Sequence, residues 1–181
     1  DDFKTLLAFA SASHLGLILA GVFSLDVVGM SGALYQIIAH ALTSGAMFLM
    51  VGIISAQLGT RKISQLGGIA HKAPVFATLF GIMMLSSVGL PTTIGFVAEL
   101  LILVGLFKTN LIYGIIATTS IIVGAVYMFV VYRKAILQSV GSVTDKFKEL
   151  SKSQILGFGF VAIIIFVMGI YPKTFLDLSE N

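Results

Sequence analysis

The chain has 181 residues, of which 57% are hydrophobic and only 10% are charged, and its formal net charge is +3. A soluble domain keeps roughly a quarter of its residues charged, so this composition excludes an ordinary soluble protein and predicts an integral membrane protein. The net charge is small and lies in loops, with nothing that resembles a nucleic-acid-binding patch, and the absence of cysteine excludes disulfides and iron–sulfur ligation by this chain.

Apolar runs recur along the chain at the length of membrane spans. One crossing needs about 20 apolar residues at a rise of 1.5 Å per residue, and this criterion predicts about six spans. We expect an all-α fold, a polytopic bundle of transmembrane helices. The start Asp1-Asp2-Phe3-Lys4 has neither Met nor a basic signal region, so residues 1–181 are expected to be a piece of a longer protein. In chain order, the spans are expected near residues 5–24, 33–57, 74–89, 92–107, 110–132 and 154–172.

A helix-breaking stretch, residues 89–95, separates the third and fourth spans. Pro91 lacks a backbone N–H and the glycines at each end of the stretch weaken a helix, so the sequence predicts one discontinuous helix near residues 89–99. Backbone carbonyl groups without hydrogen-bond partners are tolerated at membrane depth only beside protein or water. Glu99 follows directly, inside an apolar run, and burying an ionised carboxylate there costs a few kcal/mol or more. Glu99 is therefore a candidate proton-binding group.

A polar stripe follows the predicted helix 33–57. Gln36, His40 and Ser44 recur every four residues with Thr43 beside them, which places all four on one helical face. An imidazole can pass a proton from one ring nitrogen to the other, so His40 is a candidate relay residue. The alternative is a buried neutral histidine that only holds helices together. The stripe favours the relay.

Other ionisable residues are weaker candidates. Ser11, Ser13 and His14 lie among small residues on the first span, a pattern that favours hydrogen bonding across a close helix contact over a chemical role. Lys4 lies near the membrane edge, where it either extends to the surface or pairs with an acidic residue. His71 lies in a basic loop and is not expected to act chemically. The three histidines have no carboxylate at ligand spacing, so no metal site is expected.

Charge alone gives no clear orientation. The stretch 133–152, which we interpret as an extramembrane connector, holds five Lys and Arg. Six spans would place the other six on the opposite side, which is nearly a tie under the positive-inside rule. Those six are Lys4, Arg61, Lys62, Lys72, Lys108 and Lys173.

Four motifs resemble, in the same order, those of the antiporter-like membrane subunits of respiratory complex I. Gln36, His40, Ser44 and Glu99 together are most similar to the chain 4 (M-type) branch of NADH–quinone oxidoreductase, because its sister branch and the Mrp sodium/proton antiporters usually carry lysine in place of Ser44 and Glu99. The motifs are residues 2–16, 36–49, 89–99 and 169–172; departures from the family pattern are Phe9, Ala10, Ala41, Thr92 and Ala98.

The resemblance implies that the chain supplies the C-terminal part of such a subunit, namely its last six helices with the second of two inverted repeats. It implies a proton half-channel with His40 as relay and Glu99 as terminal protonatable group, with Lys4 and His14 as weaker members, driven by electron transfer elsewhere. No cofactor is expected in this chain. Expected partners are other membrane subunits of complex I, including sister antiporter-like subunits, and the lipid bilayer of a bacterial or mitochondrial inner membrane. The alternatives are an Mrp-type cation/proton antiporter subunit, a membrane subunit of an energy-converting hydrogenase, or a purely structural role.

Overall fold

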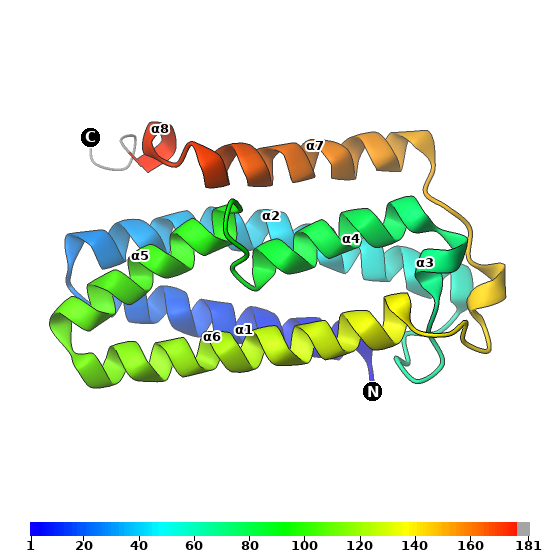
Figure 1. Cartoon of the computed structure of the whole chain (residues 1–181), viewed down its shortest axis with the longest axis horizontal. Coiled ribbons are helices and arrows are strands. Elements are labelled where there is room, and N and C mark those ends of the chain that lie inside the picture. Colours follow the sequence, from blue (N-terminus) through cyan, green and yellow to red (C-terminus); the bar gives the residue numbers. More distant parts are fainter. Residues whose placement is uncertain (177–181) are drawn as a thin grey trace.

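The computed structural model describes residues 1–176, so the last five residues of the predicted unit 1–181 lie outside the described residues. The described part is built of helices, with one isolated β-bridge between Asp2 and Lys62, which confirms the all-α fold (Figure 1). The elements are α1 (Phe3–Phe23), α2 (Val27–Leu58), α3 (Ile69–Lys72), α4 (Pro74–Ser87), α5 (Ile94–Thr109), α6 (Leu111–Tyr132), the π-helical turn η1 (Arg133–Leu137), the 3-10 turn η2 (Thr144–Lys146), α7 (Lys152–Ile170) and α8 (Lys173–Leu176).

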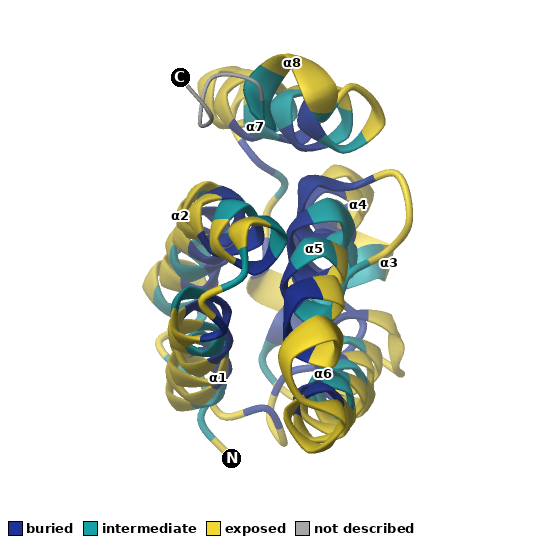
Figure 2. Cartoon of the chain, turned by 90° about the vertical axis from the view of Figure 1, so that its left-hand side faces the viewer, coloured by how far each residue is buried: buried dark blue, intermediate teal, exposed yellow. Residues whose placement is uncertain are grey.

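Four of these helices are long and apolar enough to cross a membrane by themselves. They are α1, α2, α6 extended by its π-helical turn, and α7. Viewed end on, α1 and α2 lie on one side of the bundle and α4, α5 and α6 on the other, with α7 beside α2 and α4 (Figure 2). The side chains buried between them are large and apolar, and most of the outer surface is apolar too, as a lipid environment requires. Fully buried members include Phe3, Met47, Phe76, Phe80 and Met83.

Helices α4 and α5 are each too short to cross alone. Their 14 and 16 residues reach about 21 and 24 Å, whereas the hydrocarbon core is about 30 Å thick. They lie end to end, α4 running from one end of the bundle to its middle and α5 from there to the other end (Figure 1). Together they form one interrupted crossing. This confirms the predicted discontinuous helix. The two short spans among the six expected are its halves, so the bundle has five crossings, because residues 88–93 interrupt the helix without reversing the chain.

The five-crossing path gathers the basic residues at one end of the bundle, which we call the basic end. Helices α1, α4 and α7 begin there and α2 and α6 end there (Figure 1). Ion pairs join these loops: Arg61 Nε lies 3.4 Å from Asp2 Oδ2, and Lys72 Nζ lies 2.8 Å from Asp145 Oδ1. The sequence predicted a nearly equal division of Lys and Arg between the two ends, and this prediction was wrong. It assumed six crossings, which would place the connector before α7 at the end opposite the other basic loops, whereas five crossings place them at the same end. Of the eleven Lys and Arg, nine lie at the basic end, and the other two are Lys108 and Lys173.

The start of the chain is fixed to the basic end. Asp2 caps α1, since its Oδ1 accepts a hydrogen bond from the backbone N–H of Thr5 at 2.9 Å. The N–H of Phe3 donates to the carbonyl oxygen of Arg61 at 3.0 Å. The Thr5 N–H and the Arg61 guanidinium hold the pKa of the Asp2 carboxyl below its usual range, because both favour its ionised form.

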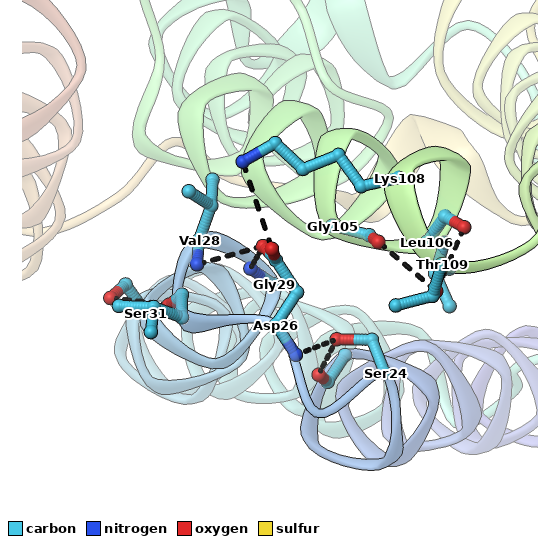
Figure 3. A network of polar contacts seen from close by, with 11 residues as sticks. Ser24, Asp26, Val28, Gly29, Ser31, Gly105, Leu106, Lys108 and Thr109 are labelled. Atoms are coloured by element: carbon cyan, nitrogen blue, oxygen red, sulfur yellow. Dashed lines mark hydrogen bonds and ion pairs between the residues drawn. The ribbon is translucent and has the colours of Figure 1, made fainter.

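Asp26 ties the α1–α2 turn to α5 at the opposite end of the bundle, which we call the turn end (Figure 3). Its Oδ1 accepts hydrogen bonds from the N–H groups of Val28 at 2.9 Å and Gly29 at 3.1 Å, and so caps α2. Its Oδ2 lies 3.7 Å from Nζ of Lys108 in the last turn of α5. Ser24 supports the same turn by donating from its hydroxyl to the carbonyl oxygen of Gly21 at 2.6 Å.

The cap should matter more than the ion pair. We expect Asp26→Ala to lower the free energy of unfolding by about 1 kcal/mol, because it leaves two helix N–H groups without their acceptor. Lys108→Ala removes the ion pair but keeps the cap. It should lower the free energy of unfolding by at most about 0.5 kcal/mol, since exposed ion pairs stabilise little. Unfolding of the two variants in detergent measures the difference. Equal losses would show that the ion pair holds the turn.

The interruption between α4 and α5 depends on unusual backbone. Gly89 has a φ of 71° and Thr92 a φ of 80°, both in the left-handed region. Thr92 stands where the resembling family has glycine, and a side chain in this region costs roughly 1–2 kcal/mol. At Gly95, a Cβ would collide with the carbonyl oxygen of Ser86, because the first turn of α5 packs directly on the last turn of α4. The glycines therefore shape the break through backbone angle and close approach, in addition to weakening the helix as predicted.

Candidate functional site

The predicted polar stripe lies on α2, but its members behave differently. His40 is half-buried, and its Nδ1 lies 3.0 Å from Oγ of Ser44, one turn further along the helix. Thr43 instead donates its hydroxyl to the carbonyl oxygen of Ala39 at 2.8 Å. Gln36 is buried, and its Oε1 has no hydrogen-bond partner within residues 1–176. Ser44 and His40 are thus the members of the stripe that contact each other.

His14, on α1, lies between His40 and Glu99. Its Nδ1 is 3.1 Å from Nδ1 of His40, and the two rings meet edge to face with centroids 5.2 Å apart. Its Nε2 is 3.9 Å from Oε1 of Glu99 on α5. Both ring nitrogens of His14 therefore face a protonatable group. The sequence favoured a packing role for His14, whereas the structure places it at the centre of a row that we call the His–Glu line: Ser44, His40, His14 and Glu99.

Glu99 lies on α5 beside the interrupted stretch. Its side chain is only 7% exposed. A Cβ on Gly89 would collide with its Oε2, so the glycine leaves room for the carboxylate against the backbone of the break. Side chains of a helix point toward its N-terminus, which explains why a residue in the second turn of α5 reaches back to the break. The discontinuity and the acid thus form one structural unit.

A small chamber borders His14 and Glu99. Its volume is about 20 Å³, and Ser13, Ser87 and Ser120 contribute to its walls. This is room for about one water molecule. The 3.9 Å between His14 and Glu99 is longer than a direct hydrogen bond, and a single bridging water is the usual way to connect polar groups at that separation.

Lys4 lies outside the His–Glu line. It is exposed in the first turn of α1, ten residues before His14. Ten helical residues correspond to about 15 Å along the axis. His71 is likewise exposed, on the short helix α3 at the basic end. Neither residue is brought to Glu99.

The sequence reasoning missed Ser120 on α6. Its hydroxyl oxygen lies 3.3 Å from that of Ser13 on α1, and both serines border the chamber. Nothing local marks Ser120, because α6 reads as an apolar span and the contact joins residues 107 positions apart. Within residues 1–176, no group of three or more His, Cys, Asp or Glu is placed to hold a metal ion.

The distances along the His–Glu line are short enough for a proton transfer that uses one bridging water between His14 and Glu99. The starting state has a proton on each nitrogen of the His40 ring, a neutral His14 protonated at Nε2, and an ionised Glu99. From this state, the proton on His40 Nδ1 would pass to His14 Nδ1, while the proton on His14 Nε2 would pass through a bridging water to Glu99. His40 then ends neutral, His14 stays neutral and Glu99 ends protonated, so charge and protons balance.

Comparisons with known proteins identify relatives of this chain. The profile of the family described as NADH:quinone oxidoreductase/Mrp antiporter, TM, matches residues 1–125. NADH-quinone oxidoreductase subunit M of Rickettsia prowazekii (strain Madrid E) is 38% identical over 178 residues, which cover 98% of this chain and 36% of that protein.

Two solved structures have the same fold. A chain of respiratory complex I from Thermus thermophilus with bound NADH matches with a TM-score of 0.89 and 35% identity, covering 97% of this chain and 37% of that one. A chain of the Mrp complex from Dietzia sp. DQ12-45-1b matches with a TM-score of 0.85 at 20% identity, over 96% of this chain and 40% of that one, a likeness of fold alone. The chain therefore spans little more than a third of the length of these relatives.

Proposed function

Since this chain belongs to the NADH:quinone oxidoreductase/Mrp antiporter transmembrane family, as its motifs predicted, we propose that it is the C-terminal part of the proton-translocating M-type subunit of an NADH–quinone oxidoreductase. It forms a proton half-channel, and electron transfer elsewhere in the complex supplies the energy. The observation that carries this proposal is the His–Glu line, three protonatable groups from three helices meeting beside an interrupted crossing.

The interrupted crossing supports transport in particular. Discontinuous helices in transporters place helix ends and unwound backbone next to the transported ion near the middle of the membrane. Here the break between α4 and α5 lies near the middle of the bundle (Figure 1), and Glu99 lies against it. A group that binds a proton at this depth can exchange it with either side of the membrane, depending on which path is open.

The charge distribution gives the proposed subunit an orientation. Nine Lys and Arg lie at the basic end and two at the turn end. The positive-inside rule places the basic end on the cytoplasmic side, or on the matrix side in a mitochondrion. The turn end, with Asp26 and Lys108, then faces the side to which protons are pumped. The proposed partners are other membrane subunits of the complex, including sister antiporter-like subunits.

Isolating the complex that carries this chain tests the assignment. We expect the chain to co-purify in mild detergent with NADH–quinone reductase activity. Reconstituted in vesicles, the same complex should move protons when NADH is oxidised. A smaller complex without that activity, which exchanges sodium for protons along an ion gradient, would contradict the proposal and support an Mrp-type antiporter.

A further inference from the structure

We propose that the paired hydroxyls of Ser13 and Ser120 connect the His14–Glu99 pair to an open cavity at the turn end, and so carry its proton exchange with that side of the membrane. This inference rests on the proposed function. The observations behind it differ from those behind the proposed function, because they concern two cavities and the wall between them.

The open cavity lies between α1 and the α5–α6 turn. Its volume is about 800 Å³, far larger than the chamber beside Glu99. Most of its lining is apolar, but it also includes polar side chains from the turn end. These are Ser24, Thr109, Asn110 and Tyr113. Because Ser24 ends α1 and Asn110 joins α5 to α6, the cavity reaches the turn end of the bundle.

The chamber and the open cavity share a wall. Ser13, Leu17 and Ser120 border both of them. Leu17 is 8% exposed and packs with Ile102 and Leu106 in a small apolar cluster. Because an apolar side chain offers water no hydrogen bonds, Leu17 interrupts a continuous chain of water molecules at this point. The two serines are the members of the shared wall that can pass a proton.

The serine hydroxyls are free to do this because they bond across helices. Their oxygens are 3.3 Å apart, and either can be the donor. Two other hydroxyls of α6 are used within their own helix: Thr118 donates to the carbonyl oxygen of Gly114 at 2.8 Å, and Thr119 donates to that of Ile115 at 2.9 Å. A hydroxyl accepts one proton while it gives up another, so a pair of hydroxyls relays a proton with no net change.

The chamber side of this route is polar as well. Ser87, at the end of α4, lines the chamber, and its buried Oγ has no hydrogen-bond partner within residues 1–176. A buried hydroxyl of this kind is usually satisfied by ordered water. The route then runs from Glu99 and His14 through water in the chamber to Ser13 and Ser120, and on to the open cavity.

Removing both hydroxyls should block this route. In the reconstituted complex, we expect the double variant Ser13→Ala/Ser120→Ala to pump protons about 100-fold more slowly, the low end of what a positioned proton-transfer group contributes. Ser120→Thr keeps a hydroxyl and should retain most of the rate. Thr119→Ala is the matched control on the same helix and should pump like wild type, because its hydroxyl bonds only to its own helix.

Cysteine labelling tests the cavity without relying on pumping, and the chain has no cysteine of its own. Tyr113→Cys places a thiol in the cavity wall, whereas Ile115→Cys places one on an exposed part of α6 outside it. A membrane-impermeant thiol reagent should modify Tyr113→Cys from the turn-end side only, and Ile115→Cys much more slowly from either side.

The outcomes separate this inference from the proposed function. If the double alanine variant pumps like wild type while Glu99→Gln does not pump, the serine route is wrong and the proposed function stands. If Glu99→Gln pumps normally, both are wrong. If the double variant does not assemble, Tyr113→Cys decides the matter: modification from the turn-end side supports the route, and modification from the basic-end side, or none, overturns it.

Discussion

The variant Glu99→Gln should assemble normally and oxidise NADH, but proton transfer through this chain should fall to near zero. Gln has almost the same shape as Glu, so the packing against Gly89 is kept, yet its amide cannot bind and release a proton. Burying an uncharged side chain at this depth also costs less than burying a carboxylate, so the variant should be at least as stable as wild type. The measurement is the number of protons moved per NADH oxidised by the complex in vesicles.

A second carboxylate provides the control for this prediction. Asp145 is exposed at the basic end and pairs with Lys72, away from the His–Glu line. Asp145→Asn also removes one carboxylate from the chain, and we expect it to leave the protons moved per NADH unchanged. Equal values for Glu99→Gln and wild type would show that the buried acid is structural.

The second large effect is expected from Gly89→Ala. Alanine at a φ of 71° costs roughly 1–2 kcal/mol in backbone energy. Its Cβ would also collide with Oε2 of Glu99 and push the carboxylate away from the break. A misplacement of about 1 Å can lower the rate of a reaction that depends on geometry roughly 100-fold. We therefore expect the pumping rate to fall far more than the loss of folding stability would explain.

Gly59→Ala separates these two contributions. Gly59 ends α2 with a φ of 69°, but a Cβ there would meet no atom within 4 Å. It should show a similar loss of stability and no loss of pumping. Thermal unfolding in detergent and proton pumping in vesicles are measured for both variants. If Gly59→Ala reduced pumping as much as Gly89→Ala, the effect would come from destabilisation and the contact between Gly89 and Glu99 would carry no function.

The sequence was most informative where a single residue conflicts with its surroundings. A carboxylate in an apolar run identified Glu99 as a candidate, and a polar stripe on one helical face identified His40. Both inferences need only the local spacing and the cost of burying polar groups in lipid. The family resemblance also followed from local motifs and is confirmed by the match over residues 1–125.

The contacts of His14 could not be predicted from the local sequence in this way. Its contacts with His40 and Glu99 join three helices at separations of 26 and 85 positions in the chain, and periodicity says nothing about which faces of different helices meet. The serine pair was missed for the same reason. The local sequence pattern predicts the face of its own helix on which a residue lies. The residues that it contacts on other helices depend on the packing of the whole bundle.

The sequence predicted the discontinuous helix but counted its two halves as separate spans, for a different physical reason. A stretch with glycine and proline looks the same whether the chain turns round or continues in the same direction. Here the backbone angles of Gly89 and Thr92, and the close approach of Gly95 to Ser86, keep α4 and α5 end to end. This one difference places the long basic connector at the same end of the bundle as the other basic loops and turns a near tie of charges into nine against two.

Infrared difference spectroscopy of the complex during NADH oxidation can detect whether a buried carboxyl group changes its protonation during turnover. We expect a carbonyl band of a protonated carboxylic acid that appears or disappears with turnover, is present in Asp145→Asn and is absent in Glu99→Gln. A band that is unchanged in Glu99→Gln, with pumping retained, would contradict this expectation, since the protons would then pass through this chain without using Glu99.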